Sequence, residues 1–365
     1  MSAAVVIVKV GTSSITGGDG ELDEGALAKL AADIVAARTA GHRVVLVMSG
    51  AIAAGMPALG FTRRPTDIGT LQALAAVGQP RLVARLGDLL APAGVVAGQV
   101  LLTPYDFLHR SQYVHARQTL GQLLDLGVLP VVNENDPVAD DEIRYGDNDR
   151  LAALVAHMLG AALLLMLTDT AGVFTADPRV DEAASLIEEI VEVDQALEAA
   201  AGGAGSERGS GGMASKLAAA KIATWSGARA VIAAASVPGV VVDAIAGRPV
   251  GTAFAPRPLH LSSRKLWIAF ARGSEGRIVV DGGARRALVA DGRSLLLAGV
   301  RGVSGEFGAD AVVEIVDEAG EVFAKGIARH GSAVLAEFGG RRRDEIPEGL
   351  ASEAVHRDDL VVLPG

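Results

Sequence analysis

The chain has 365 residues, of which 50% are hydrophobic, so it is long enough for two domains with well-packed cores. It has no cysteine, which excludes disulfide frameworks and thiolate metal sites, and its start, MSAAVVIVKV, lacks the features of a signal peptide. Because the formal net charge is −10, bulk attraction to nucleic acid or to a membrane is not expected, and the composition predicts a cytoplasmic enzyme that holds small substrates by local groups.

In chain order, short runs of Val, Ile and Leu alternate with amphipathic stretches. The first run, Val5–Val10, is followed by an expected helix at Glu24–Thr39, and further runs lie at residues 44–47, 95–102, 129–132, 163–167 and 230–234. Continuous apolar strands that alternate with helices predict a mostly parallel sheet covered on both faces, which is an α/β three-layer αβα sandwich.

Residues 151–167 are apolar except for His157 and resemble a membrane span. The segment is shorter than the ~20 residues that a span needs, and Gly160 divides it. We therefore expect a buried helix followed by a buried strand.

The pattern changes near residue 256. Residues 258–273 indicate a linker between a catalytic domain at 1–257 and a small β-rich domain at 274–365. The short strands of the second domain are expected at residues 276–281, 294–297, 311–317 and 322–330. The glycine-rich residues 202–212 lie within the first domain, where they favour a mobile loop over a ligand.

Two lysines, Lys9 and Lys216, lie beside glycines and hydroxyl residues. Small residues let backbone N–H groups approach a polyphosphate, and a lysine adds a point charge. Lys9 is followed by GTSS, which favours phosphate contact over an edge-strand role. Lys216 follows GSGGMAS, but it could equally be a solvated residue in the first turn of a helix.

Polar segments follow several of the expected strands, where ligands of a parallel sheet collect. Ser49 is a natural helix N-cap, and a helix that starts there also offers N–H groups to a carboxylate. Residues 133–137, NENDP, and 146–149, GDND, place acids near the lysines, although turn and helix-start chemistry could explain them. Such carboxylates either orient the lysines or bind a substrate ammonium. Thr168 and Asp169 end another expected strand and are candidates for nucleotide contact, but a simple turn would also explain them.

The order of the segments VKVGTSS, SGAIAAG, NENDPV, GDND, LTDTAGVFTADPR and GSGGMASK resembles the amino acid kinase family, and in detail its bacterial members that phosphorylate glutamate for proline synthesis. The resemblance covers essentially the whole chain, because the C-terminal part is similar to a PUA domain, an RNA-associated module. Ser210 and Ser215 stand where the family usually has threonine, so the hydroxyls remain.

The resemblance implies that Lys9 and Lys216 contact the transferred phosphoryl group and that Asp149 holds the lysines. It implies a glutamate site that comprises Ser49, Gly50, Ala51, Asn133, Asp136 and Asn148. It implies an ATP site that comprises Lys9, Gly11, Thr168, Asp169, Ser210, Gly211, Gly212, Met213, Ala214, Ser215 and Lys216. No residue is assigned to a metal, because Mg²⁺ would be held mostly by ATP oxygens and water.

The implied reaction transfers the γ-phosphoryl group of ATP, with Mg²⁺, to the γ-carboxylate of L-glutamate and gives L-glutamyl 5-phosphate. L-proline is expected as a feedback inhibitor, glutamate semialdehyde dehydrogenase as the recipient of the product, and a homo-oligomer as the assembly. A kinase of the same fold for another acid or for a nucleoside monophosphate is one alternative. An RNA-binding protein led by the C-terminal domain is the other, but residues 266–365 carry 12 Lys and Arg against 16 Asp and Glu, which argues against it.

Overall fold

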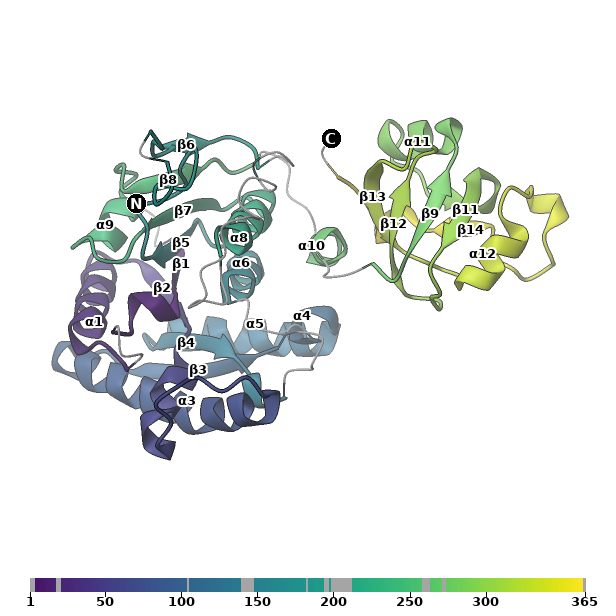
Figure 1. Ribbon diagram of the computed structural model, residues 1–365. Helices are drawn as coiled ribbons and strands as arrows, with labels where there is room; N and C mark the ends of the chain where they lie inside the picture. Colours follow the sequence, from purple (N-terminus) through teal and green to yellow (C-terminus); the bar gives the residue numbers. More distant parts are fainter. Residues whose placement is uncertain are drawn as a thin grey trace. The chain divides into compact units, whose positions relative to one another are not determined.

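The chain forms two compact units, Met1–His260 and Leu261–Gly365, each of which is described by itself (Figure 1). The structure is a computed structural model. It describes residues 4–17, 21–103, 105–138, 148–181, 183–193, 197, 212–257, 263–270 and 274–363.

The first unit alternates strands and helices in the predicted order. Its strands are β1 (Val5–Val10), β2 (Arg43–Met48), β3 (Ala97–Leu102), β4 (Leu129–Glu134), β5 (Leu163–Thr168), β6 (Glu189–Ile190), β7 (Arg229–Ala234) and β8 (Gly251–Phe254). Its helices are α1 (Glu24–Thr39), α2 (Ala51–Gly55), α3 (Ile68–Leu90), α4 (Tyr105–Leu108), α5 (Arg110–Asp125), α6 (Asn148–Leu159), α8 (Met213–Trp225) and α9 (Val240–Ile245).

The strands form one sheet in the order β3-β4-β2-β1-β5-β7-β8-β6. Every neighbouring pair is parallel except β7 and β8. From β1 the chain continues to β2 on one side, and β5 pairs on the other side, so β1 lies where the strand order reverses. In such sheets ligands bind beyond the carboxyl ends of the strands at that point. The predicted fold class, a mostly parallel α/β sheet with a β-rich second part, is confirmed.

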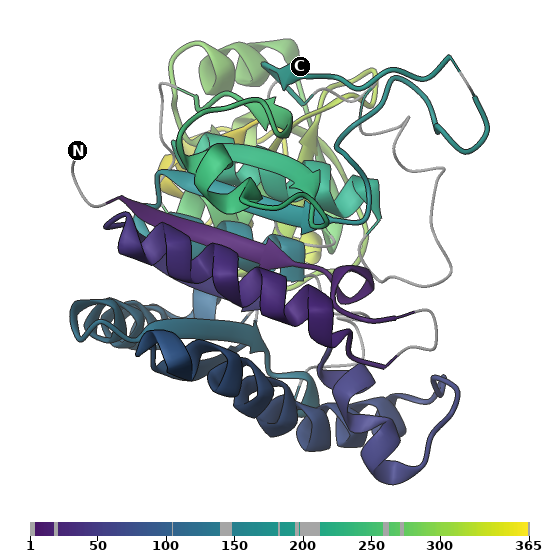
Figure 2. The same cartoon turned by 90° about the vertical axis from the view of Figure 1, so that its left-hand side faces the viewer.

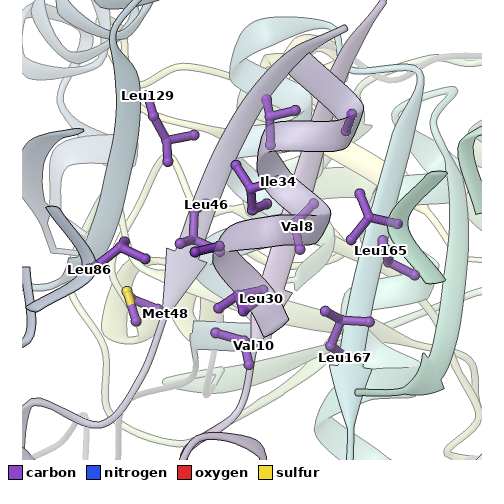
Figure 3. Packing of buried hydrophobic residues seen from close by; sticks show 14 of the residues in the cluster. Val8, Val10, Leu30, Ile34, Leu46, Met48, Leu86, Leu129, Leu165 and Leu167 are labelled. Carbon is purple, nitrogen blue, oxygen red and sulfur yellow. The ribbon is translucent and has the colours of Figure 1, made fainter. Parts of the chain in front are cut away.

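Alternate residues of the central strands face opposite sides of the sheet. Val8 and Val10 of β1 pack with Leu46, Leu165 and residues of α1 and α3 in one buried cluster (Figure 3). Figure 2 shows α1 and α3 over this face. On the opposite face, α6 contacts β1 and α8, so the intervening residue Lys9 points toward these two helices.

Residues 151–167 belong to α6 and β5, as the sequence predicts for this apolar stretch. Both elements are almost completely buried within the first unit. Among the helices that the structure describes, none has the length and apolar character required to cross a membrane.

The second unit is built around a sheet in the order β11-β9-β12-β13-β15, with a small β10-β14 pair. Part of the predicted linker is helical, because the apolar side chains of Leu266 and Ile268 are buried and the helix that carries them contacts β13 and β15. The elements are α10 (Ser263–Phe270), β9 (Gly276–Val280), α11 (Gly282–Val289), β10 (Leu295–Leu296), β11 (Val300–Ser304), β12 (Val312–Val316), β13 (Val322–Ile327), α12 (Ser332–Phe338), β14 (Glu353–Val355) and β15 (Leu360–Val362).

Candidate active site

A buried carboxylate bridges the two predicted lysines. Lys9 Nζ lies 2.5 Å from Asp149 Oδ1, and Lys216 Nζ lies 3.3 Å from Asp149 Oδ2. All three side chains are at least 93% buried, and they come from β1, the first turn of α6 and the second turn of α8. We call Lys9, Asp149 and Lys216 the lysine bridge. Because it carries two cations and one anion, it has a surplus positive charge that suits a phosphate.

The electrostatics of Asp149 follow from its neighbours. Burial alone would raise its pKa, but the Lys9 and Lys216 ammonium groups outweigh burial and lower the pKa to about 2. The hydroxyl of Ser215 lies 2.7 Å from Asp149 Oδ2 and supports the charged form. Asp149 is therefore ionised throughout the neutral range and holds both lysines in place.

Backbone groups surround the lysine bridge. The N-cap of helix α8 is Gly212, which has no side chain to cap the helix. The first N–H groups of a helix have no intrahelical acceptor. The backbone of Gly11 passes close to Lys9, since a Cβ added there would lie 3.8 Å from Lys9 Nζ. Lysine charge, helix start and close glycine backbone together form the arrangement that binds phosphate oxygens.

The loop after β2 differs from its prediction. The sequence favours Ser49 as the N-cap of α2, but Gly50 occupies that position with φ +102°. Only glycine adopts this conformation readily, and a Cβ at Gly50 would also approach Ile15 Cδ1 to 2.9 Å. The Ser49 hydroxyl instead accepts a hydrogen bond from Asn148 Nδ2 at 3.0 Å. Ser49 is thus a member of a side-chain network and does not cap the helix.

Two glycines fix the position of α2 against α3. A Cβ at Gly78 would lie 1.7 Å from the carbonyl oxygen of Ala51, and a Cβ at Gly55 would lie 2.1 Å from that of Leu74. The two backbones are therefore in direct contact, and any side chain at either glycine would force them apart. This contact sets the place of the loop that carries Ser49.

A row of hydrogen-bonded side-chain amides begins at the exposed Gln99 and ends at Ser49, and its members Gln79, Asn133 and Asn148 are buried. Asn133 Nδ2 donates to Gln79 Oε1 at 3.2 Å, and Asn148 Nδ2 donates to Asn133 Oδ1 at 2.9 Å. Gln99 Nε2 donates to Gln79 Oε1 at 2.9 Å. We call Gln99, Gln79, Asn133 and Asn148 the amide chain. At its end, the buried Asn148 Oδ1 has no hydrogen-bond partner among the described residues, which leaves an acceptor for a substrate donor.

Asp136 lies beside the amide chain. Burial raises its pKa to about 6, although the Arg64 guanidinium and a hydrogen bond from Gln79 offset part of the rise. A cation that binds beside such a carboxylate stabilises its charged form, because the cation offsets the free-energy cost of burying the charge. Asp136 and Asn148 Oδ1 thus provide two oxygens of the kind that bind an ammonium group.

The remaining predicted residues lie at the end of β5 or beyond the described residues. Thr168 is buried and donates a hydrogen bond to Asp169 Oδ1 at 3.0 Å, while Asp169 is exposed. Leu167, the preceding residue, accepts a hydrogen bond from Gly11 N at 3.4 Å, so this strand end adjoins the Gly11 loop. Ser210 and Gly211, with most of the loop predicted at 202–212 and residues 146–147, lie outside the described residues.

Comparison with known proteins decides the family. The model described as the amino acid kinase family matches residues 4–234, and the model of the PUA domain matches residues 276–350. The chain belongs to the amino acid kinase family. Glutamate 5-kinase of Moorella thermoacetica is 44% identical over 98% of this chain and 96% of its own, and glutamate 5-kinase of Herpetosiphon aurantiacus is 45% identical over 98% of both chains.

Solved structures agree on the fold. Carbamate kinase from Giardia lamblia bound to AMP-PNP has a TM-score of 0.51 at 19% identity and covers 70% of this chain and 99% of its own. An isopentenyl phosphate kinase has a TM-score of 0.50 at 20% identity over 69% of this chain and 100% of its own. The family and fold predicted from the segment order are therefore confirmed, whereas the ligand contacts of single residues stay predictions.

Sequence reasoning missed two members of the amide chain. Gln79 lies within α3 and Gln99 within β3, and each appears in the sequence as an isolated glutamine between apolar residues. A glutamine at a buried position must find hydrogen-bond partners, so its place in the apolar period of α3 is the signal that could have identified Gln79.

Proposed function

We propose that the protein transfers the γ-phosphoryl group of ATP to the γ-carboxylate of L-glutamate and forms L-glutamyl 5-phosphate, the first step of proline synthesis. The observation that carries the proposal is the adjacency of the lysine bridge to an acceptor site with a carboxylate and an open amide oxygen. Asn148 and Asp149 are consecutive residues, yet one belongs to the amide chain and the other to the lysine bridge. The naming of the relatives as glutamate 5-kinases supports the same reaction.

The mechanism needs no general base. A γ-carboxylate with an ordinary pKa of about 4.3 is already ionised at neutral pH. The residues of this chain therefore act by orientation and by charge neutralisation. Lys9 and Lys216 draw the anionic carboxylate and the anionic phosphate together, while Asp149 keeps the two ammonium groups at a fixed separation. Asp136, Asn148 and Ser49 hold the α-amino end of the acceptor.

Magnesium fits this site as a companion of the nucleotide. Both oxygens of Asp149 face lysines, and among the described residues no three His, Cys, Asp or Glu side chains group to hold a metal. Phosphate oxygens and water would therefore supply most of its ligands. When bound, Mg²⁺ lowers the charge repulsion at the transferred phosphoryl group.

The acceptor assay tests the function directly. We expect release of ADP that requires L-glutamate and Mg²⁺, and a γ-hydroxamate when hydroxylamine traps the acyl phosphate. UMP and N-acetylglutamate serve as matched acceptors, because the first represents a nucleotide kinase and the second lacks the ammonium group. Equal turnover with either of them would reject the assignment.

The acyl phosphate product reacts with water, so we propose its transfer to glutamate semialdehyde dehydrogenase.

L-Proline shares the α-carboxylate and cationic nitrogen of glutamate but has no γ-carboxylate, so we propose that it inhibits by occupying the acceptor site. A homo-oligomer stays a prediction.

The second unit gives little support to an RNA-binding function. Several of its arginines pair with acids on neighbouring strands or turns, which cancels the charge that a phosphate backbone requires. These pairs are Arg277 with Glu314, Arg285 with Asp317, Arg301 with Asp281, and Arg329 with Glu353. Filter binding with RNA at two salt concentrations separates the two functions, since tight, salt-sensitive binding without kinase activity would favour the alternative.

We also propose that residues 1–257 are catalytically complete. Arg257 N donates to Thr224 O at 3.0 Å, and the Arg257 guanidinium lies 4.7 Å from the Trp225 ring, so a chain that ends after Arg257 keeps its contacts with α8. Such a truncation should retain glutamate-dependent ADP release. A folded but inactive truncation would contradict the proposal.

A further inference from the structure

Gln79 uses its whole hydrogen-bonding capacity at the acceptor site. Its side chain is buried, and Oε1 accepts from Gln99 Nε2 at 2.9 Å and from Asn133 Nδ2 at 3.2 Å. Nε2 donates to the carbonyl oxygen of Glu134 at 3.2 Å, and a further side-chain hydrogen bond links Gln79 with Asp136. A glutamine amide has two donors and two acceptor positions, so this side chain is fully satisfied in one orientation.

The position of Gln79 is fixed independently of these hydrogen bonds. It follows Gly78, whose Cα faces the backbone of Ala51 so closely that no Cβ could be accommodated. Helix α3 therefore cannot rotate or shift at this residue without moving α2. The backbone position of Gln79 is therefore fixed, and its amide lies between Gln99 and Asn133 in the amide chain.

Two contacts orient the Asn133 amide: Gln79 Oε1 accepts from its Nδ2, and the backbone N–H of Glu134 donates to its Oδ1 at 2.9 Å. Because Gln79 presents Oε1 to Asn133, Asn133 must present Nδ2 to it and Oδ1 to the other side. Asn133 Oδ1 in turn requires Nδ2 of Asn148, which leaves Asn148 Oδ1 buried without a partner among the described residues. The opposite orientation of Gln79 would place a donor against a donor along the chain.

We propose that Gln79 is a positioning residue that, together with the backbone N–H of Glu134, fixes the polarity of the amide chain, so that Asn148 and Asp136 both present oxygens to the α-ammonium group of the acceptor. The inference rests on the proposed glutamate kinase function and adds to it the source of selectivity for an amino acid over a plain dicarboxylic acid. Gln79 touches neither substrate; it acts through Asn133, Asn148 and Asp136.

Two variants test the proposal in the full-length chain. Gln79→Glu keeps the shape and both acceptor positions but loses both donors and adds a negative charge beside Asp136. Gln79→Met keeps a similar length and removes every hydrogen bond. Gln118→Glu is the matched control, because Gln118 is exposed on α5. The probes are L-glutamate, measured by KM, and glutarate, which lacks only the α-amino group, measured by its inhibition constant.

We expect Gln79→Met, which removes the acceptor for Asn133, to raise KM for glutamate by about tenfold or more, with kcat and KM for ATP within about threefold of the parent chain. Gln79→Glu keeps that acceptor, so it should raise KM for glutamate less than Gln79→Met does. The inhibition constant of glutarate should change by less than about threefold, since glutarate makes no ammonium contact. The preference for glutamate over glutarate should therefore shrink. Gln118→Glu should preserve all four constants. Thermal unfolding shows whether each variant is folded.

Three results would overturn the inference. A folded Gln79→Met variant that keeps the full preference for glutamate would show that Gln79 does not control the ammonium site. Equal loss toward glutamate and glutarate, or loss of folding in both variants, would assign Gln79 a purely structural role. Failure of the proposed function itself is recognised earlier, because the parent chain would then release no glutamate-dependent ADP.

Discussion

The lysine bridge and the amide chain meet at the start of α6, but ion pairs stabilise the first and neutral hydrogen bonds stabilise the second. The lysine bridge consists of three buried charges whose attraction exceeds the cost of burial, so the pKa of Asp149 falls to about 2. The amide chain consists of neutral dipoles, and beside it the pKa of Asp136 rises to about 6 because burial dominates. The charge state of Asp149 is thus insensitive to pH in the neutral range, whereas that of Asp136 changes near pH 6.

Removing the central charge of the lysine bridge should have the largest effect. Asp149→Asn leaves two buried ammonium groups without their carboxylate, and breaking a buried ion pair in this way costs about 3–5 kcal/mol. We expect a lower midpoint in urea unfolding and severe loss of kcat. In the parent chain the depressed pKa stabilises the fold above about pH 4, and this contribution should disappear as the pH falls toward 2.

A surface pair provides the matched control. Asp177 also has its pKa lowered to about 2, mainly by a hydrogen bond from Arg179 at 2.8 Å, but this pair is exposed to solvent. Asp177→Asn should leave the unfolding midpoint almost unchanged, since exposed ion pairs contribute little. Similar destabilisation by both substitutions would contradict the comparison between buried and exposed charge.

The next effect is catalytic. Lys216→Ala should lower kcat by about a hundredfold, or about 3 kcal/mol, and raise KM for glutamate much less, because the charge is most needed in the transition state. Lys221→Ala, on the same helix, should leave both constants near their parent values. Near-normal kcat in the Lys216 variant would remove it from the catalytic site.

A smaller effect is expected on the acceptor side. Asp136→Asn should weaken glutamate and L-proline together by roughly 1.5–3 kcal/mol, because each loses the same charge-assisted hydrogen bond. KM for glutamate, the inhibition constant of proline and its relief by excess glutamate measure this. Loss of glutamate affinity with full proline sensitivity would require a separate regulatory site.

The smallest change is the pH dependence of the parent chain. Protonation of Asp136 removes the charge that attracts an ammonium group, so KM for glutamate should be constant above about pH 7 and rise about tenfold per pH unit below about pH 6. At saturating glutamate, kcat should stay flat, because Asp149 remains ionised in this range. Constant KM between pH 5 and 8 would show that Asp136 does not bind the ammonium group.

Much of the fold was predictable because its signals are local. The apolar runs gave the central strands, and α1 has the predicted bounds, Glu24–Thr39. The strand β8 and helix α10 were missed, since they are short, with four and eight residues, and their burial depends on the rest of each unit. The predicted adjacency of Lys9, Asp149 and Lys216 is found in the structure.

The acceptor side was less predictable because its contacts span the chain. Ser49 looked like an N-cap from its neighbours, whereas its hydroxyl binds Asn148, 99 residues away. The place of Gln79 in the apolar period of α3 indicates that it is buried, but its hydrogen-bond partners are known only when α3, β3 and β4 come together. Periodicity does not identify long-range partners of this kind.

One peptide unit joins Asn148 of the amide chain to Asp149 of the lysine bridge, so the distance between these two parts of the site is covalently limited. The two Cα atoms are ~3.8 Å apart, as in any trans peptide, so a single peptide unit of α6 separates the amide chain from the lysine bridge. Because the two residues share one peptide unit, motion of α6 carries both parts of the site together. If Asn148 binds the ammonium group as proposed, we expect an acid one methylene shorter than glutamate to present its carboxylate short of the lysines.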